Sequence, residues 1–432
     1  MRMRIAIVTT GDEIMSGNVA DTNSAWIADK CWMLGHEVVW HGGVGDHTDA
    51  IGDACMLAEK RAEVVFVTGG LGATLDDITV ESAAKVFGKK IILHEDIWRG
   101  IQDFFKRVGR ECTENNKRQA YLPEGGKPLT NTVGTAPGVQ VKFGKAVFFF
   151  LPGVPKELFQ IFGDSILPWL AERSGENVYE QRFLRCFGIP EASFDERLKD
   201  IELGDVRMSF RVTFPEVKIK LVARKCSCPP PHCRRAGIYG AKEPMNSGPI
   251  NRATTNISNV EKQIRARIGE YIYGTDDETM AAVVGKLLLK NKKRVAIAES
   301  CTGGLIAHML TNVPGASNWF ERGVVSYSNE SKMQILSVKE ATIKKHGAVS
   351  EACAREMAEG VRKISGADFG LAVTGIAGPT GGTKEKPVGT VHIALASLKG
   401  IEHVHCCFPR DRESFKAIVA YEAMDIVRRT LM

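Results

Sequence analysis

The sequence lacks an apolar stretch long enough to cross a bilayer, and it lacks a long block of lysine and arginine. The first absence argues against a transmembrane helix, which needs about 20 predominantly apolar residues in a row. The second removes the usual mark of a nucleic-acid stripe or a membrane-surface helix. The N-terminus carries a short apolar run that soon meets acidic residues, without a small-residue cleavage site. We therefore expect a cytoplasmic protein with no membrane partner.

Cysteine is present but shows no disulfide pattern. The 11 cysteines are mostly scattered singly within apolar segments, which is typical of small buried side chains. The exception is KCSCPPPHCRR, where Cys226, Cys228, His232 and Cys233 could surround a zinc ion. Their spacing fits no paired-knuckle pattern, so we do not expect zinc there. We interpret 226–260, which is rich in turn residues, as an extended loop.

The chain is long enough for more than one hydrophobic core. Its 432 residues exceed what one core usually supports, and 44% hydrophobic with 25% charged residues is ordinary for a globular protein. The net charge of +6 is modest and indicates no particular partner. We predict three domains, covering residues 1–173, 174–275 and 276–432.

Strand-like runs alternate with helical periods at both ends of the chain. RIAIVTTG, EVVWHGGVG and EVVFVTGG resemble strands, and NSAWIADKCWMLGH and DAIGDACMLAEKRA have a helical period. Near the C-terminus, KRVAIAES, RGVVSYS, DFGLAVTG and GTVHIALAS resemble strands separated by helices. This order predicts an α/β protein with two α/β domains built on parallel-type sheets. Mixed signals between them predict a small α+β domain.

A glycine-rich and acidic loop follows the third predicted strand. Ligands bind beyond the carboxyl ends of strands in parallel sheets. In VTGGLGATLDDIT, backbone N–H groups of Gly69, Gly70 and Gly72 could approach a phosphate, and Asp76 with Asp77 could hold a hard cation. The alternative is a tight turn with a helix-capping aspartate.

The loop after the first strand adds further polar groups at the same sheet edge. TTGDEIMSGNVADTN contains Asp12, Glu13, Asp21 and Asn23. Together with the glycine loop, these residues suggest metal-assisted chemistry on a phosphorylated ligand.

Five ordered strings resemble the N-terminal domain of the CinA family (competence/damage-inducible protein A): TTGDEIMSGNVADTNSAWIA, TGGLGATLDDIT, ENNKRQAYLPEG, NTVGTAPG and LPGVPKEL. The resemblance implies a fold related to the molybdopterin-binding fold. It also implies ADP-ribose pyrophosphatase activity with a divalent metal ion, Co²⁺, Mg²⁺ or Mn²⁺. On this resemblance, Asp76 and Asp77 serve the metal, and Gly69, Gly70 and Gly72 bind the substrate phosphates. From the loop after the first strand, we add Glu13 as a metal ligand and Asn23 as a substrate-binding residue.

The string AESCTGG joins a predicted strand to a helix and contains two hydroxyl side chains and a thiol. A hydroxyl nucleophile needs a base, and a lysine can be that base if its pKa is lowered. We predict Ser300 as the nucleophile and Lys332 as its base. Tyr327 is predicted to orient the pair, and Thr374 ends a third strand at the same edge. The alternative is that Ser300 or Thr302 only caps the helix.

Several groups around this pair are predicted to bind the substrate: Cys301, Thr302, Gly303, Gly304, Gly375, Gly378 and Arg412. The N–H groups from Cys301 to Gly304 would stabilise an oxyanion. Arg412 would bind a nucleotide phosphate, although it could equally be a solvated surface residue. Cys301 is the rival nucleophile. The residues leave open whether an acyl-serine forms or the serine only orients water.

AESCTGG, SYSNESK and AVTGIAGPTGGTKEKPVGTV resemble the C-terminal domain of the same family, which also occurs alone as a nicotinamide-nucleotide amidase. The resemblance implies a homodimer that converts nicotinamide mononucleotide to nicotinate mononucleotide and ammonia, with no cofactor at this site. Two alternatives stay open. One is a molybdopterin-binding protein of cofactor biosynthesis. The other is a nucleic-acid-associated competence factor with a KH-like middle domain, although we do not expect nucleic acid as a partner.

Overall fold

The computed structural model describes residues 2–175, 178–225 and 252–432. Their contacts form two compact units, Met1–Glu180 with Ala223–Thr255, and Gln181–Val222 with Asn256–Met432. In the described part of the chain, no helix combines the length and the apolar character needed to cross a membrane. The residues of the zinc hypothesis lie outside the described residues: Cys226, Cys228, His232 and Cys233.

The first unit is built on a six-stranded sheet with the order β2-β1-β3-β8-β7-β6. Its strands are β1 (Arg4–Thr10), β2 (Glu37–Val44), β3 (Val64–Thr68), β6 (Lys127–Leu129), β7 (Gly138–Phe143) and β8 (Ala146–Leu151). A separate two-stranded sheet pairs β4 (Ile91–Leu93) with β5 (Tyr121–Pro123). The helices are α1 (Asp12–Met15), α2 (Thr22–Met33), α3 (Thr48–Arg61), α4 (Thr79–Val86), α5 (Glu95–Arg107), α6 (Pro155–Ile161) and α7 (Leu167–Ala171).

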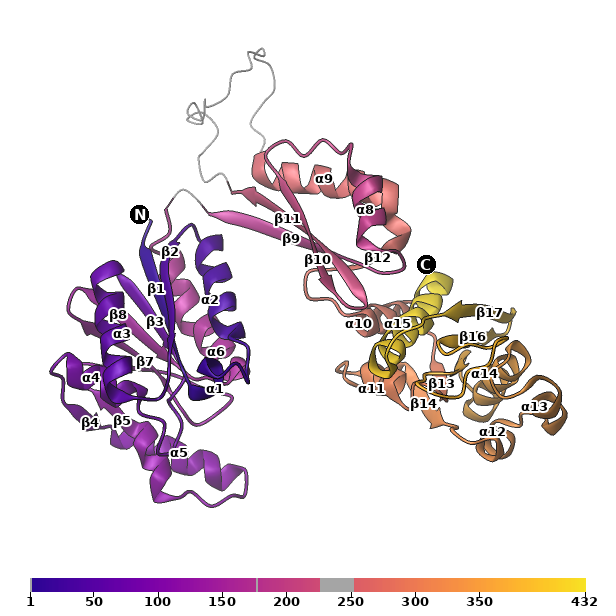
Figure 1. The fold of residues 1–432 in the computed structure, drawn as a ribbon, viewed down its shortest axis with the longest axis horizontal. Coiled ribbons are helices and arrows are strands. Elements are labelled where there is room, and N and C mark those ends of the chain that lie inside the picture. The colour runs from indigo at the N-terminus through magenta and orange to yellow at the C-terminus, as the bar shows by residue number, and fades with distance from the viewer. Residues whose placement is uncertain (1, 176–177, 226–251) are drawn as a thin grey trace, which may run out of the picture. The chain divides into compact units, whose positions relative to one another are not determined.

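Helices cover both faces of the six-stranded sheet (Figure 1). One core joins α3 and α4 to the strands, and the other joins α2, α6 and α7 to the opposite face. β3, VVFVT, is buried at every position, as expected for a central strand between two helical layers. The predicted α/β layering of this unit is confirmed.

The prediction of a parallel-type sheet was wrong for two of the six strands of this sheet. β2, β1, β3 and β8 run parallel, but β7 and β6 are antiparallel to their neighbours. β7 and β8 are joined directly by Gly144 and Lys145. Parallel strands need a crossover of about a dozen residues. A two-residue connection therefore forces these two strands into an antiparallel hairpin.

The middle of the chain contributes a four-stranded sheet to the second unit, with the order β10-β11-β9-β12. Its elements are β9 (Tyr179–Cys186), α8 (Glu191–Leu198), β10 (Arg207–Thr213), β11 (Glu216–Arg224), α9 (Arg252–Ile268) and β12 (Ile272–Thr275). The succession β-α-β-β-α-β is the ferredoxin-like one, rather than a KH arrangement. Between residues 174 and 275, the sequence contains one GXXG string, GIYG at 237–240, and it lies outside the described residues.

The expected loop at 226–260 ends earlier than predicted, because α9 already begins at Arg252. Its first two turns contain threonine and asparagine, which have modest helix propensity and resemble a loop. Ile257, Val260, Ile264 and Ile268 are buried and continue one helical stripe. Burial of that stripe therefore outweighs the local preference of the polar residues.

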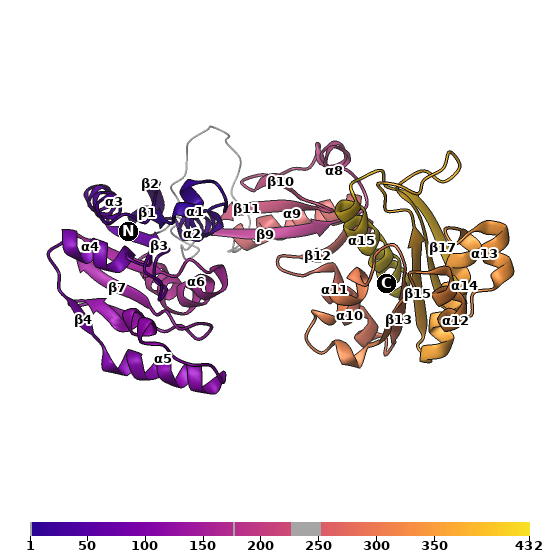
Figure 2. The same ribbon diagram turned by 60° about the horizontal axis from the view of Figure 1, so that its bottom comes forward.

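The C-terminal part is a five-stranded sheet with the order β14-β13-β15-β16-β17. Its strands are β13 (Val295–Glu299), β14 (Phe320–Val325), β15 (Phe369–Gly375), β16 (Thr390–Ser397) and β17 (Gly400–Cys407). Its helices are α10 (Met280–Lys290), α11 (Leu305–Thr311), α12 (Asn329–Leu336), α13 (Glu340–His346), α14 (Glu351–Ser365) and α15 (Arg412–Leu431). Figure 2 shows α14 on one face, and α10, α11 and α15 on the other.

The five-stranded sheet is also mixed, contrary to the prediction of a parallel-type sheet. β14, β13 and β15 are parallel, whereas β16 and β17 are antiparallel to their neighbours. No helix crosses over between β15 and β16, and a tight turn joins β16 to β17. The three parallel strands are the ones whose ends carry the predicted site.

A buried polar cluster lies where the middle sheet meets the C-terminal part of the second unit. Arg185 donates to both carboxylate oxygens of Glu216 at 3.0 and 2.5 Å, and Tyr273 donates its hydroxyl to the same carboxylate. Burial opposes ionisation of Glu216, but these hydrogen bonds outweigh it and lower its pKa. Phe187 and Tyr273 also belong to the apolar core that contains Met280 and Ala420. The middle and C-terminal regions therefore share one core.

We expect Glu216→Gln to destabilise the second unit, because it leaves the Arg185 guanidinium buried without its counter-charge. Removing one partner of a buried pair costs about 3 kcal/mol or more. The measurement is the free energy of unfolding of the second unit in urea, monitored with a spectroscopic probe in that unit. Glu196→Gln breaks the exposed ion pair with Lys199 and serves as the control, with an expected change of about 0.5 kcal/mol or less. Equal effects of the two substitutions would contradict this prediction.

Candidate active sites

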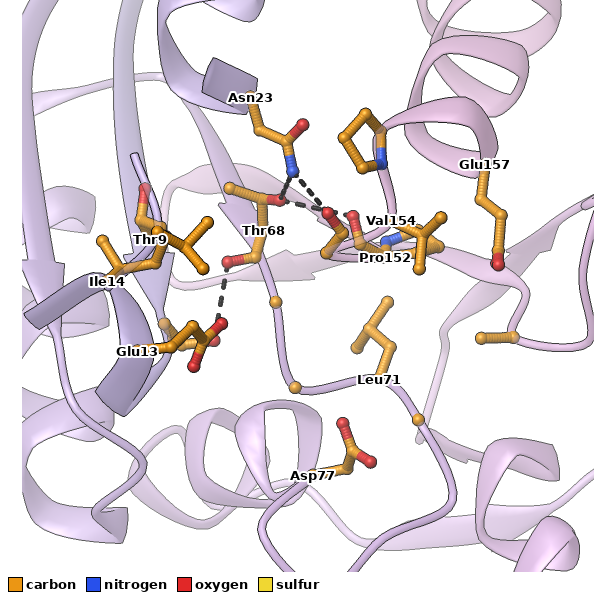
Figure 3. A pocket seen from close by; sticks show the side chains of 18 of the residues that line it. Thr9, Glu13, Ile14, Asn23, Thr68, Leu71, Asp77, Pro152, Val154 and Glu157 are labelled. Carbon is orange, nitrogen blue, oxygen red and sulfur yellow. Dashed lines mark hydrogen bonds between the residues drawn. The ribbon is translucent and has the colours of Figure 1, made fainter. Parts of the chain in front are cut away.

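A cavity of about 420 Å³ lies at the carboxyl ends of β1, β3 and β8 in the first unit. Figure 3 shows its lining, with Asn23, Thr68, Glu13 and Asp77 around one space. The location agrees with the rule that ligands bind beyond the carboxyl ends of parallel strands. The structure brings together the predicted residues Glu13, Asn23, Gly69, Gly70, Gly72 and Asp77 at this cavity.

Asn23 is held by two hydrogen bonds that leave its carbonyl oxygen unpaired. Its Nδ2 donates to Thr68 Oγ1 at 3.2 Å and to the carbonyl of Gly153 at 2.8 Å. Oδ1 is buried and has no hydrogen-bond partner among the described residues. Because a buried acceptor without a partner is costly, a ligand that donates a hydrogen bond would be stabilised here.

The glycine loop after β3 is required by the fold as well as available to a ligand. Gly69 and Gly70 have φ of 110° and 63°, and a Cβ at Gly70 would collide with Thr79 Oγ1. The N–H group of Gly69 donates to Leu151 at 3.1 Å, which extends the ladder beyond β3 and β8. Gly69 therefore has no N–H group left for a phosphate, contrary to our prediction for it.

The three carboxylates predicted as metal ligands are not assembled. Asp76 is exposed and does not line the cavity, whereas Glu13 and Asp77 do. Asp77 Oδ2 accepts two hydrogen bonds from Thr74, at 2.8 Å from its N–H and 2.5 Å from its hydroxyl. Across residues 2–175, 178–225 and 252–432, no three His, Cys, Asp or Glu side chains converge to hold a metal. The hydrogen bonds of Asp77 therefore agree with the alternative interpretation of this loop as a tight turn.

The cavity is acidic nonetheless. Its lining includes four carboxylates, Glu13, Asp21, Asp77 and Glu157, and within the described chain no lysine or arginine lines it. Hard divalent cations prefer oxygen ligands, and Mg²⁺ is usually held by one or two carboxylates together with substrate phosphates. These residues therefore fit a divalent cation that is bound with an anionic substrate, and they do not fit a site formed by the protein alone.

Gln119 was missed by the sequence analysis. It lies in the string ENNKRQAYLPEG, and its Oε1 is a second buried acceptor with no partner in the described part of the chain. A single neutral amide gives no signal in one sequence, so only its position in the fold identifies it.

In the second unit, Ser300 and Lys332 meet as predicted. Lys332 Nζ lies 3.0 Å from Ser300 Oγ, 2.8 Å from the carbonyl oxygen of Ser326 and 3.2 Å from that of Tyr327. Lys332 is 1% exposed, and this burial lowers its pKa. A neutral amine has two N–H groups and one lone pair. In that form, the two N–H groups would bind the two carbonyl groups, which would leave the lone pair for the Ser300 hydroxyl.

Glu299 caps α11, so the capping alternative for Ser300 and Thr302 was wrong. The carboxylate of Glu299 is 1% exposed and accepts from the N–H groups of Gly304, Ile306 and Ala307 at 3.0, 3.1 and 2.8 Å. Neither Ser300 nor Thr302 makes a side-chain cap bond to this helix. The sequence analysis missed Glu299 because it ends a buried strand and precedes the usual capping position.

The turn leaves fewer oxyanion donors than predicted. The N–H group of Gly303 donates to the carbonyl of Ser300 at 3.2 Å, and that of Gly304 is taken by Glu299. Of the four expected donors, the N–H groups of Cys301 and Thr302 are the two without a backbone acceptor among the described residues. Gly303 and Gly304 serve the backbone instead, with left-handed φ of 64° and 98°.

Cys301 is a poor rival to Ser300. It is buried, and burial raises the pKa of its thiol to about 12. The thiolate is the reactive form of cysteine, so this thiol is inert at neutral pH.

Arg412 contacts two other residues of the predicted site. It donates to the carbonyl of Gly378 at 2.8 Å and to the hydroxyl of Tyr327 at 2.9 Å. Arg412 is exposed, as the surface alternative predicted, but its guanidinium is held by these two contacts. Thr374 is buried, but its hydroxyl donates to the carbonyl of Ala348 at 2.9 Å and not to the Ser300 pair. Gly375 packs against Thr390 and Val391, where a Cβ would not fit comfortably.

Lys416 is a further residue that the sequence analysis missed. It follows Arg412 by one turn of α15, so both cations project from one face of that helix. Its Nζ lies 3.7 Å from the point that a Cβ on Gly303 would occupy. A cation over the nucleophile turn makes this edge of the sheet suited to an anionic substrate.

The sequence matches two family models, the CinA C-terminal domain over residues 277–431 and the Probable molybdopterin binding domain over residues 6–172. A relative from Acetivibrio thermocellus is 40% identical over 436 residues, covering 100% of this chain and 99% of the relative. The CinA-like protein of Desulfosudis oleivorans is 39% identical over 432 residues, covering 99% of each chain. Fold, sites and matches thus define a protein with a molybdopterin-binding-type region followed by a CinA C-terminal domain. The chain belongs to the CinA family.

A solved relative exists for part of the chain. The crystal structure of the competence damage-inducible protein A (ComA) from Klebsiella pneumoniae is 37% identical to this chain, covers 35% of this chain and 94% of its own, and has a TM-score of 0.35. A TM-score of this size carries no argument about the fold.

We expect iodoacetamide at pH 8 to alkylate the exposed Cys407 and to leave Cys301 unmodified in the folded protein, because only an accessible thiolate reacts. Peptide mass spectrometry measures both sites in one sample. In urea, both cysteines should react, which controls for detection of the Cys301 peptide. Rapid alkylation of native Cys301 would restore it as a candidate nucleophile.

Proposed function

We propose that the C-terminal region hydrolyses the carboxamide of nicotinamide mononucleotide to nicotinate mononucleotide and ammonia. The single observation that supports this is the buried Lys332 amine beside Ser300 Oγ, with both N–H acceptors supplied by backbone carbonyls. Lys332 takes the proton of Ser300, and Oγ attacks the amide carbon. The N–H groups of Cys301 and Thr302 stabilise the oxyanion. Lys332 then donates its proton to the departing ammonia.

We propose that the reaction passes through an acyl-serine. With Lys332 as the base, Ser300 Oγ, 3.0 Å from its Nζ, is the oxygen that the site would activate. After ammonia leaves, the neutral amine can deprotonate a water that attacks the ester and releases the acid. The nucleotide phosphate binds Lys416, whereas Arg412 fixes the Tyr327 ring through its hydroxyl.

We propose that the N-terminal region hydrolyses ADP-ribose to AMP and ribose 5-phosphate with a divalent metal ion. An acidic cavity without lysine or arginine in its described lining supports a substrate that brings a cation with it. When bound, the cation would neutralise charge on the diphosphate. Glu13 would hold it, and the unpaired oxygens of Asn23 and Gln119 would accept ribose hydroxyl groups.

A molybdopterin-binding role is the second candidate for this cavity, favoured by the match of residues 6–172 to a molybdopterin binding domain. Titration with ADP-ribose and with a molybdopterin would separate the two. The homodimer, the cytoplasmic location and the absence of a nucleic acid partner stay predictions.

The amidase proposal is tested by ammonia release from nicotinamide mononucleotide. We expect Ser300→Ala to lower kcat by about a thousandfold or more, and Cys301→Ala to retain most of the activity. Lys332→Met keeps the apolar stem and should be inactive as well. In the wild-type protein, kcat/KM should rise with pH as Lys332 loses its proton, with a midpoint below the ordinary lysine value of about 10.4. Loss of activity in Cys301→Ala with retention in Ser300→Ala would overturn the assignment.

The pyrophosphatase proposal is tested by AMP release from ADP-ribose. We expect activity with Mg²⁺, Mn²⁺ or Co²⁺ and none after chelation by EDTA. Glu13→Gln removes a charge from the cavity and should lower kcat/KM by about tenfold or more. Asp76→Asn removes an exposed charge outside the cavity and is the matched control, with little change expected. Undiminished activity in EDTA would contradict the proposal.

A further inference from the structure

Two further cavities continue from the acidic one along helix α5. One, of about 390 Å³, is lined by Phe104, Phe105, Val108, Arg110, Gly134, Thr135 and Glu157. The other, of about 350 Å³, lies between α5 and the segment 128–137. Thr135 lines all three cavities, and Glu157 lines the acidic cavity and the first of these two. The three cavities are therefore adjacent, with these residues between them.

The wall between these spaces is rigidly built. It is the loop NTVGTAPG, whose Asn131 Nδ2 donates to Ala136 at 2.8 Å and to Glu157 at 2.6 Å. Asn131 Oδ1 accepts the N–H groups of Val133 and Gly134 at 2.9 and 2.8 Å. One side chain thus closes the loop on itself and ties it to α6. Its shape is preformed, as is usual for ligand sites.

The cavities along α5 differ in chemistry from the acidic one. Phe104 and Phe105 are half-buried, and their rings stand at 84° with centroids 6.0 Å apart. The guanidinium of Arg107 lies 5.5 Å from the centroid of Phe104. The acidic cavity offers threonine hydroxyls, glycine backbone and carboxylates instead. A ligand that spans both needs a hydrophilic part and a flat aromatic part.

We propose that the Phe104–Phe105 cavity is a nucleobase subsite for the adenine end of the substrate. This inference rests on the proposed cleavage of ADP-ribose. It assigns protein contacts to the adenosine part of the substrate, which is released as AMP. The base stacks on the face of Phe104, with Phe105 beside it, and the chain to the diphosphate passes the Gly134–Thr135 backbone, which carries no large side chain. Base stacking on aromatic side chains contributes substantially to nucleotide affinity.

The test is calorimetric binding of AMP and of ribose 5-phosphate to the full chain, with and without Mg²⁺. Phe104→Ala is expected to raise the Kd for AMP and the KM for ADP-ribose by about tenfold, and to leave the Kd for ribose 5-phosphate unchanged. Phe104→Leu keeps the apolar bulk without the aromatic face and is expected to weaken AMP binding in the same direction. Trp98→Ala, on the same helix but lining neither cavity, is the matched control with no expected change.

The outcomes separate this inference from the proposed function. If ADP-ribose is cleaved and folded Phe104→Ala and Phe105→Ala variants keep the wild-type Kd for AMP, the subsite is overturned and the pyrophosphatase stands. If AMP binds in a Phe104-dependent way but ADP-ribose is not cleaved, the subsite stands and the pyrophosphatase fails. Equal losses for AMP and ribose 5-phosphate in Phe104→Ala would also overturn a base-specific role.

Discussion

The buried carboxylate of Glu299 is the constraint on which the C-terminal site depends. A helix that begins directly after a strand leaves N–H groups without partners, and some acceptor must satisfy them. Glu299 supplies that acceptor from the end of β13 and takes three of these groups. The turn can then be tight and rich in glycine, because Ser300 is not needed to cap the helix. The Ser300 hydroxyl instead lies 3.0 Å from Lys332 Nζ, and burial lowers the pKa of that amine.

The two sites of this chain have opposite electrostatics. The C-terminal site presents the cations Arg412 and Lys416 near Ser300 and Lys332, so an anionic ligand would meet positive charge already in place. The N-terminal cavity presents carboxylates and backbone amides, and an anion there requires a positive charge from elsewhere. This contrast supports the proposal that a metal ion acts at the N-terminal site. The difference in charge follows from the side chains that line the edge of each sheet.

The sequence predicted the position of both sites because strand ends converge at a sheet edge, and β14, β13 and β15 do lie side by side. It did not predict the antiparallel strands, since strand-like runs carry no direction and only the short connections decide it. Contacts made by single polar residues were also missed, as for Glu299, Gln119 and Asn131. Their roles depend on partners distant in sequence or on a turn that composition alone does not define. Asp76 and Asp77 were treated alike because they are adjacent, and the backbone directs only Asp77 into the cavity.

The core shared by the middle sheet and the C-terminal part has a consequence for how such chains can be divided. Phe187 lies 5.5 Å from Tyr421 between ring centroids, and Arg428 donates to the carbonyl of Glu270 at 2.7 Å. Both partners on α15 would face water if the chain began at residue 277, where the match to the C-terminal domain begins. Arg428 already carries a charge, whereas Tyr421 would lose an aromatic neighbour. A relative that exists as that domain alone is therefore expected to carry a more polar side chain in place of Tyr421, or to cover that position with another subunit.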